Sequence, residues 1–198
     1  DDFVKAMEDA NGADLTQFRL WYTQAGTPEV TVTRRYDPRA KSYELSFRQS
    51  CPPTPGQQEK KPFLIPVEVG LLGKDGKEII LNQPTPPSPP LPRGGLGGVT
   101  QSREGTRILD LKNSRETFVF SDIPEEPVPS ILRGFSAPVK VKLDLSDDER
   151  LFLMANDNDP FNRWDAGQQL AVKLILDLVK DHQEGRPLLL DNLFIDAF

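Results

Sequence analysis

Histidine and cysteine are nearly absent from this chain of 198 residues, which holds one histidine, His182, and one cysteine, Cys51. A catalytic zinc site usually takes two or three histidine ligands, and a hydrolytic triad needs a histidine base beside its nucleophile. A single cysteine allows no disulfide within the chain, which favours a reducing compartment. We therefore expect this chain to contain no catalytic residue, no cofactor-binding residue and no metal ligand.

Long apolar runs and clustered basic residues are also missing. No apolar stretch approaches the roughly twenty residues that a membrane-spanning helix needs, so we expect no membrane span. The formal net charge is −6, and lysine and arginine are not gathered into one segment. Nucleic acids and anionic membranes both select for clustered basic residues. The composition therefore argues against both as partners.

The two ends of the sequence have an unusual composition. It begins with Asp1-Asp2-Phe3, without an initiator methionine, a signal core or a transit segment. It ends in the apolar residues 193–198, which begin a helical pattern and then stop. We expect a cut or processed start, and a truncation inside a helical array at the end.

Helical spacing opens the chain. Apolar residues recur along Phe3 to Ala10 until Asn11-Gly12, a pair that commonly ends a helix. Asp14 can cap a second helix, in which apolar residues recur at helical spacing from Leu15 to Tyr22. Two such short helices cannot bury both of their faces, so we expect residues 1–27 to be the end of a larger domain.

From Glu29 the apolar period changes from helical to two, which is typical of strands. Turn signals such as Asp37-Pro38 and Lys74 to Lys77 separate short runs, and no helical pattern interrupts them. Pro66 indicates an edge or a bulge, because proline cannot donate to a ladder. The pattern predicts an Ig-like antiparallel β-sandwich over residues 28–144, flanked by helical segments, in a mainly β fold with some α; its strands are expected at 29–34, 43–48, 63–72, 79–81, 108–111, 117–120 and 139–143.

Helix returns at residues 145–198, where we expect the start of a helical domain. Ser146 and Glu149 have the spacing of a capping box. Asp159 can cap a longer helix with Pro160 at its first position. The apolar stripe of this helix is expected to contain Phe161, Trp164, Ala171, Leu174, Ile175 and Leu178, and a further helix is expected to begin at Asn192.

Two segments are rich in proline, Cys51 to Pro62 and residues 82–105, and the second also carries four glycines between Gly94 and Gly98. The second composition cannot pair in a sheet and predicts a mobile or polyproline-like segment. It would suit either a ligand for a proline-recognition domain or a tolerated surface insertion. Both interpretations remain open at this point.

Other patterns suggest chemistry but have simpler explanations. His182 lies beside Asp181 and Glu184, but a metal site would need two more ligands nearby, and His182 equally suits the solvated C-terminal end of a helix. The acidic residues 144–149 and 157–159 lack the glycine of a calcium loop, and helix capping explains them. Gly94 to Gly98 lacks the strand, helix and Lys-Ser/Thr pair of a phosphate loop and indicates a linker. Cys51 has no neighbouring base that would activate it as a nucleophile.

Several longer blocks resemble one enzyme family, the zinc-dependent aminopeptidase N family, most closely its alanyl aminopeptidase branch in bacteria and plants. The resemblance covers nearly the whole chain except residues 82–105. The blocks are residues 3–10, 14–18, 21–28, 52–57, 118–120, 127–130, 134–139 and 161–166.

The resemblance implies a parent enzyme that uses zinc to remove amino acids from peptide N-termini. The family's His-Glu-x-x-His and Gly-x-Met-Glu-Asn motifs do not occur in this sequence, so no catalytic or zinc position carries over. It further implies that the sandwich links the catalytic domain to the helical domain that covers the active site. We therefore expect a non-catalytic linker fragment whose partners are those two domains, in a soluble intracellular protein of the cytoplasm or a plastid. The alternative is an independent Ig-like interaction module with a proline-rich docking loop.

Overall fold

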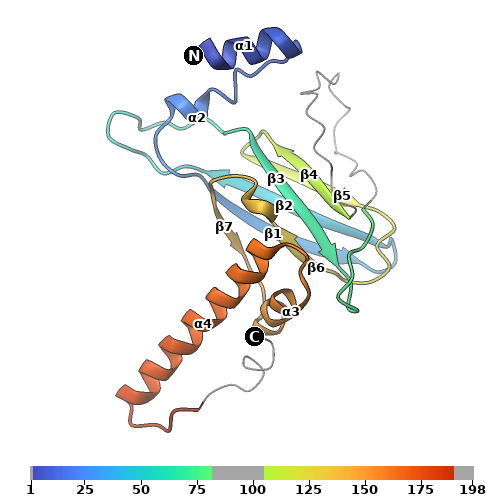
Figure 1. Ribbon diagram of the computed structural model, residues 1–198, viewed down its shortest axis with the longest axis vertical. Coiled ribbons are helices and arrows are strands. Elements are labelled where there is room, and N and C mark those ends of the chain that lie inside the picture. The colour runs from blue at the N-terminus through green and yellow to red at the C-terminus, as the bar shows by residue number, and fades with distance from the viewer. Residues whose placement is uncertain (1, 82–104, 190–198) are drawn as a thin grey trace.

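The computed structural model describes residues 2–81 and 105–189. A sandwich of two sheets forms the middle of the molecule, with two short helices at one end and a helix pair at the other (Figure 1). The helices are α1 (Asp2–Asn11), α2 (Leu20–Thr23), α3 (Asp147–Asn156) and α4 (Pro160–Gln183), and a 3-10 helix spans Arg133–Phe135. The strands are β1 (Glu29–Asp37), β2 (Ser42–Ser50), β3 (Ile65–Leu72), β4 (Thr106–Leu111), β5 (Arg115–Phe120), β6 (Val128–Ile131) and β7 (Lys140–Leu143).

The strands form one four-stranded sheet, in the order β5-β2-β1-β7, and one three-stranded sheet, in the order β4-β3-β6. Alternate side chains of both sheets point inward, because successive residues of a strand face opposite sides. They form one core that includes the fully buried Leu45, Phe47, Ile65, Val69 and Leu109. The expected mainly β sandwich with flanking helices is confirmed.

The strand pairing agrees with the sequence-based expectation except at two places. Every strand pair is antiparallel apart from β1 and β7, which run parallel with Val30 beside Val141. The expected strand at 79–81 is wrong, since only Glu78 forms an isolated bridge, to Leu72. Its place as the seventh strand is taken by β6, which sequence reasoning missed because Pro129 interrupts a short run.

Pro66 lies in a central strand, although a proline favours an edge. It is tolerated because β6 pairs only with residues 69–72 of β3, so at Pro66 the strand has a neighbour on one side alone. The missing N–H of proline therefore breaks no ladder. The edge expectation is wrong for the strand as a whole but holds locally at this residue.

The first helical region is shorter than expected. Helix α1 ends at Asn11 before Gly12, which has φ +59°, as the pattern predicts. The second helix shrinks from the expected 15–22 to Leu20–Thr23. Asp14 accepts from the amide of Thr16 at 2.9 Å and forms a turn, so it does not cap the predicted helix.

The capping predictions at the other end are confirmed. Ser146 and Glu149 form both bonds of the capping box, and Asp159 accepts from the amide of Asn162 at the start of α4. The expected stripe on α4 is not a buried one, since Trp164 and Ile175 are each 58 % exposed, and the buried residues are Ala166 and Leu170. No helix in the described ranges is long and apolar enough to cross a membrane. The expected helix at 192–198 and the proline segment at 82–104 lie outside the described residues.

Candidate functional site at the junction of sandwich and helices

Buried polar side chains gather where the sandwich meets α3 and α4. Six polar or charged residues are classed as buried in the described part of the chain. Five of them lie together at this junction: Thr106, Ser130, Arg133, Asp157 and Asp159. With Glu78, which is bound to Arg133, they form what we call the Arg133 cluster. A polar group costs free energy when it is buried, so such a concentration marks a place where the chain uses polar contacts for a specific arrangement.

Arg133 is at the centre of the cluster and is 4 % exposed. Its guanidinium group forms an ion pair with Glu78 and a second with Asp157 Oδ1 at 3.1 Å. It also donates to two hydroxyl groups, those of Ser130 at 2.8 Å and Thr106 at 2.9 Å. These partners come from the turn after β3, from β4, from β6 and from the end of α3. One side chain therefore ties four separate segments together.

The guanidinium fits only because Gly70 of β3 has no side chain. A Cβ atom at Gly70 would lie 2.1 Å from Arg133 Cζ, far closer than two carbon atoms can approach. The chain around Arg133 is also unusual, since Leu132, Gly134 and Phe135 all have φ between 53° and 60°. Non-glycine residues adopt such angles rarely and at a cost of about 1–3 kcal/mol each. The surrounding contacts hold this conformation in place.

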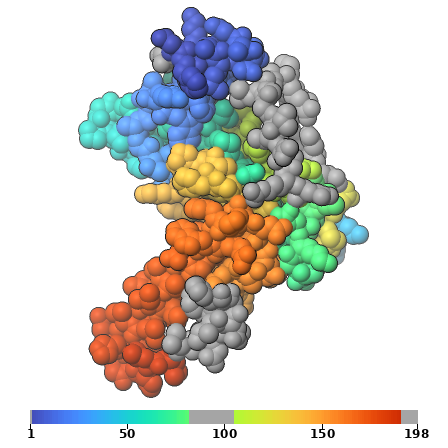
Figure 2. Space-filling view, viewed as in Figure 1, coloured from blue at the N-terminus to red at the C-terminus, as the bar shows by residue number. Residues whose placement is uncertain are grey.

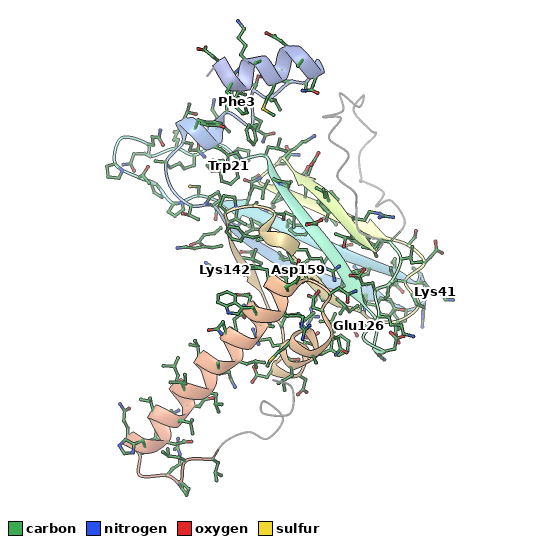
Figure 3. All side chains as sticks on the ribbon, viewed as in Figure 1. Phe3, Trp21, Lys41, Glu126, Lys142 and Asp159 are labelled. Atoms are coloured by element: carbon green, nitrogen blue, oxygen red, sulfur yellow. The ribbon has the colours of Figure 1, made fainter. Side chains whose placement is uncertain are left out.

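Two aspartates connect the cluster to the helices. Asp157 is the C-cap residue of α3, and its Oδ1 accepts from the amide of Asp159 at 2.9 Å. Asp159 is the N-cap of α4, and its second oxygen accepts from the amide of Gly134 at 2.9 Å. Asn162 continues the connection by donating to Ser130 Oγ at 2.8 Å. Figure 3 shows Asp159 at the point where α4 leaves the sandwich.

Asp157 is the most enclosed carboxylate of the cluster, with a side chain that is 0 % exposed. Burial raises the pKa of this carboxyl group, and hydrogen bonds and the charge of Arg133 offset that effect only in part. Its Oδ2 atom is buried without a hydrogen-bond partner among the described residues. The single positive charge of Arg133 is thus paired with two carboxylates, those of Glu78 and Asp157. Burying the second carboxylate lowers the stability of the fold.

A second ionic contact joins the sandwich to α3. Arg34 of β1 binds Glu149 through both of its terminal nitrogens, and the Nη2–Oε2 distance is 2.7 Å. Burial acts against ionisation of Glu149, but the bonds from Arg34 and Ser146 bring its pKa below the ordinary value. The same carboxylate belongs to the capping box of α3. Arg34 therefore attaches the first turn of the helix to the four-stranded sheet.

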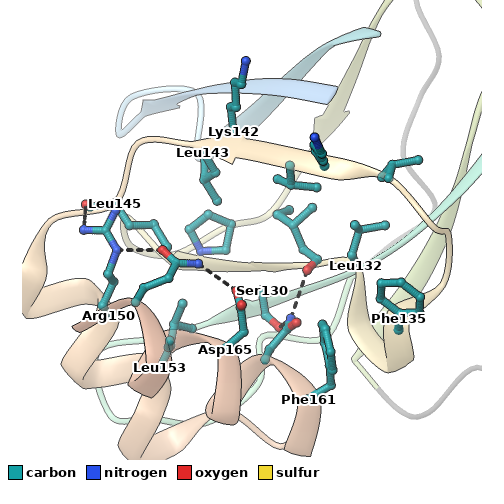
Figure 4. A pocket seen from close by; sticks show the side chains of 18 residues that line it. Ser130, Leu132, Phe135, Lys142, Leu143, Leu145, Arg150, Leu153, Phe161 and Asp165 are labelled. Carbon is teal, nitrogen blue, oxygen red and sulfur yellow. Dashed lines mark hydrogen bonds between the residues drawn. The ribbon is translucent and has the colours of Figure 1, made fainter. Parts of the chain in front are cut away.

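A cavity of about 410 Å³ lies beside these contacts, between β7 and the two helices (Figure 4). Apolar side chains from both sides line it, among them Leu143, Leu153 and Phe161. The polar groups in its wall bind one another, since Arg150 donates to Gln169 and Gln169 donates to Asp165. Arg150, Gln169 and Asp165 therefore already have partners within the wall.

The candidate residues from the sequence do not meet in this structure. His182 is exposed in the last turn of α4, and Cys51 is half-buried beside Gly26. The acidic residues at 147–149 and at 159 serve the starts of α3 and α4, in agreement with the capping interpretation. Over residues 2–81 and 105–189, no group of three or more His, Cys, Asp or Glu side chains could hold a metal ion.

Sequence reasoning missed the Arg133 cluster altogether. One signal was available, because a glycine inside a strand often marks a close approach by another group, and Gly70 is such a residue. The partners Glu78 and Asp157 are 55 and 24 residues away from Arg133, a separation that no local pattern reveals.

Two family models match the chain. The model described as "Domain of unknown function (DUF3458) Ig-like fold" matches residues 26–144. The model described as "Domain of unknown function (DUF3458_C) ARM repeats" matches residues 147–198. The Arg133 cluster contains residues from both matched ranges, since Asp157 and Asp159 lie in the second.

Named relatives extend far beyond this chain. Aminopeptidase N of Escherichia coli is 41 % identical over 198 residues, which are 100 % of this chain and 21 % of that protein. Aminopeptidase N of Haemophilus influenzae is 36 % identical over 188 residues, 95 % of this chain and 20 % of that protein. The crystal structure of Legionella pneumophila aminopeptidase A in complex with aspartic acid superimposes with a TM-score of 0.72 at 29 % identity, over 99 % of this chain and 19 % of that one.

The chain thus spans about a fifth of the length of the curated relatives that it matches. An Ig-like family model covers more than half of it, and a helical-repeat model follows directly. The chain belongs to the DUF3458 Ig-like-fold family and corresponds to an internal segment of aminopeptidase N proteins.

Proposed function

We propose that this chain is the structural spacer of a zinc metallo-aminopeptidase, an enzyme that removes N-terminal amino acids from peptides. Residues 1–27 would end the catalytic domain, residues 28–144 form the spacer, and residues 145–198 begin the helical domain. Zinc and the residues that act on peptide substrates would then lie elsewhere in the full-length protein. We place that protein in the cytoplasm or in a plastid.

The Arg133 cluster is the observation that carries this proposal. A flexible connection between two domains needs few contacts across it, and interdomain motion is the default when an interface is small. Here a buried ion-pair network, the Arg34–Glu149 pair and an apolar cluster of Leu72, Leu153 and Met154 all cross the junction. Such a junction would transmit the orientation of the sandwich to the helices.

The exposed face of α4 supports a continuing helical array as a partner. In its second half Val172, Ile175, Leu176 and Val179 are 47–62 % exposed. Figure 2 shows this half of the helix projecting from the body of the molecule. Helical repeats bury their apolar faces against neighbouring repeats, and a single unit cannot do so alone. We infer that the following repeats of the full-length protein cover this face.

The proposal is tested in the full-length enzyme with Arg133→Met. We expect kcat for an aminoacyl chromogenic substrate to fall at least tenfold, because the helical domain loses its fixed position over the catalytic domain. The zinc content should stay unchanged, since the proposal places the zinc ligands outside this chain. Arg39→Met serves as the matched control, because Arg39 is exposed on the hairpin turn. Normal kcat in the folded Arg133→Met enzyme would refute the spacer role.

A further inference from the structure

The segment 51–62 is fastened to the chain that leads from α2 into β1, and Lys60 is its main contact. The ammonium group of Lys60 donates to Ala25 O at 2.9 Å, to Thr54 Oγ1 at 2.7 Å and to Gln57 Oε1 at 3.1 Å. An ammonium group has three protons, so these three oxygens use its full donor capacity. Lys60 thereby joins its own segment to residue 25 of the connector.

Two glutamines complete the connection. Gln57 donates to Thr23 O at 2.7 Å and accepts from the amide of Ala25 at 2.8 Å. Gln24 makes the reverse contact, since it accepts from the amide of Lys61 at 2.8 Å and donates to Lys61 O at 2.9 Å. Within the segment, Thr54 and Gln57 exchange two backbone hydrogen bonds. Pro55, which lies between Thr54 and Gln57, therefore belongs to a folded turn and not to an extended polyproline segment.

The residues that flank the segment, Gln49 and Phe63, are fixed to one another independently of Lys60. Gln49 is buried, accepts from the amide of Phe63 at 2.8 Å and donates to Phe63 O at 2.9 Å, so the two ends of the segment are held together. Trp21 holds the connector independently, because its indole donates to Leu64 O at 2.9 Å and its ring lies 4.6 Å from that of Phe63. Between these two fixed points the contacts are mostly polar and exposed or half-buried; the exception is Cys51, which packs against the core.

The two ends of the spacer thus differ in how strongly their contacts resist local opening. The Arg133 cluster is buried and cannot open without exposing ion pairs, whereas the contacts of Lys60 and Gln57 exchange readily for contacts with water. Regions with few buried apolar contacts open locally at a fraction of the global free energy of unfolding. Gly26, at φ +100°, lies within the fastened connector and can adopt other conformations at little cost.

We propose that residues 51–62 form a latch, which opens as a local unit and releases residues 23–27 while the sandwich stays folded. Lys60 is the positioning residue that keeps the latch closed. If the proposed spacer role is correct, the catalytic side of the enzyme has an adjustable attachment and the helical side a fixed one. The latch itself does not depend on that role, because it is a property of this chain.

Hydrogen exchange of the 198-residue chain tests the latch with Lys60→Met. The informative amides are those of Ala25 and Lys61, because both bond to glutamine side chains and neither bonds to Lys60 itself. We expect both to exchange about tenfold faster or more, since three hydrogen bonds that keep the latch closed are lost. The amide of Phe63, bonded to Gln49, should keep its protection.

Lys74→Met is the matched control, because Lys74 is exposed on the turn that follows β3 and lies outside the segment 51–62. Its replacement should leave the exchange of all three amides unchanged. Gln57→Met is a second variant, read at the Lys61 amide alone, and it should accelerate exchange there as well. Unchanged exchange at Ala25 and Lys61 in Lys60→Met would overturn the proposal. Acceleration at Phe63 to the same degree would also overturn it, because the segment would then open only together with the core.

Discussion

Replacing Gly70 by alanine adds one methyl group to β3, and the structure predicts an effect far larger than that change suggests. In most strands alanine is better than glycine by about 0.5–1 kcal/mol, because it loses less backbone entropy on folding. At this position the new Cβ would lie 2.1 Å from Arg133 Cζ, 2.4 Å from Nη1 and 2.5 Å from Nε. The guanidinium group must therefore leave its position or push β3 aside.

The magnitude follows from what Arg133 leaves behind. Its departure strands the carboxylates of Glu78 and Asp157, whose side chains are 14 % and 0 % exposed. Breaking a buried ion pair from one side costs about 3–5 kcal/mol. After the favourable effect of alanine is subtracted, Gly70→Ala should lower the free energy of unfolding by about 2–4 kcal/mol.

The assay is a double-mutant cycle by urea unfolding, followed by circular dichroism. Arg133→Met removes the clash, so Gly70→Ala should cost less than about 0.5 kcal/mol in that background. The coupling free energy between the two sites should therefore amount to about 2–4 kcal/mol. Gly167→Ala is the matched control, because its Cβ would lie 3.4 Å from the flexible Met154 Sδ and it sits in a helix, where alanine is favoured. Equal stability of Gly70→Ala and the unmodified chain, or strict additivity in the cycle, would refute the reasoning.

Two further predictions concern a titrating group and a surface. Asp157→Asn should gain stability relative to the unmodified chain as the pH rises above about 4, the ordinary pKa of an aspartate, because burial raises the pKa of Asp157 in the folded chain and ionisation of this group therefore opposes folding. Parallel stability curves from urea unfolding at each pH would contradict this. Ile175→Glu should change the free energy of unfolding by less than about 0.5 kcal/mol, since Ile175 is exposed. A large loss of stability in urea unfolding would show that this face of α4 is already covered.

Local chemistry made much of the architecture predictable from the sequence. The hairpin of β1 and β2 follows from period-two spacing around Asp37, whose carboxylate accepts from the amides of Arg39 and Ala40. The starts of α3 and α4 follow from Ser146 and Asp159, because a cap needs only residues within three positions of it. These features are encoded by neighbours in the chain.

The features that the sequence did not predict correctly depend on partners distant in the chain. The expected helix at 15–22 gave way because Gln17 donates to the carbonyls of Pro62 and Lys112, contacts that hold the segment as turns on the sandwich. Helical spacing predicts the apolar stripe of α4 but does not say whether that face has a partner, and the structure leaves Trp164 and Ile175 of the stripe exposed. The Arg133 cluster could not be predicted from the sequence, because its members show no local pattern. They come together only when the sheet and the helices are assembled.

The distance between the sandwich and the end of α4 tests the central claim most directly. Spin labels at Thr33 and Lys180, both exposed, would report it after Cys51→Ser removes the native thiol. We predict one narrow distance distribution in this background and a clearly broader one when Arg133→Met is added, with the strand content preserved. Distributions of equal width in the two proteins would contradict the claim that the Arg133 cluster fixes the helices to the sandwich.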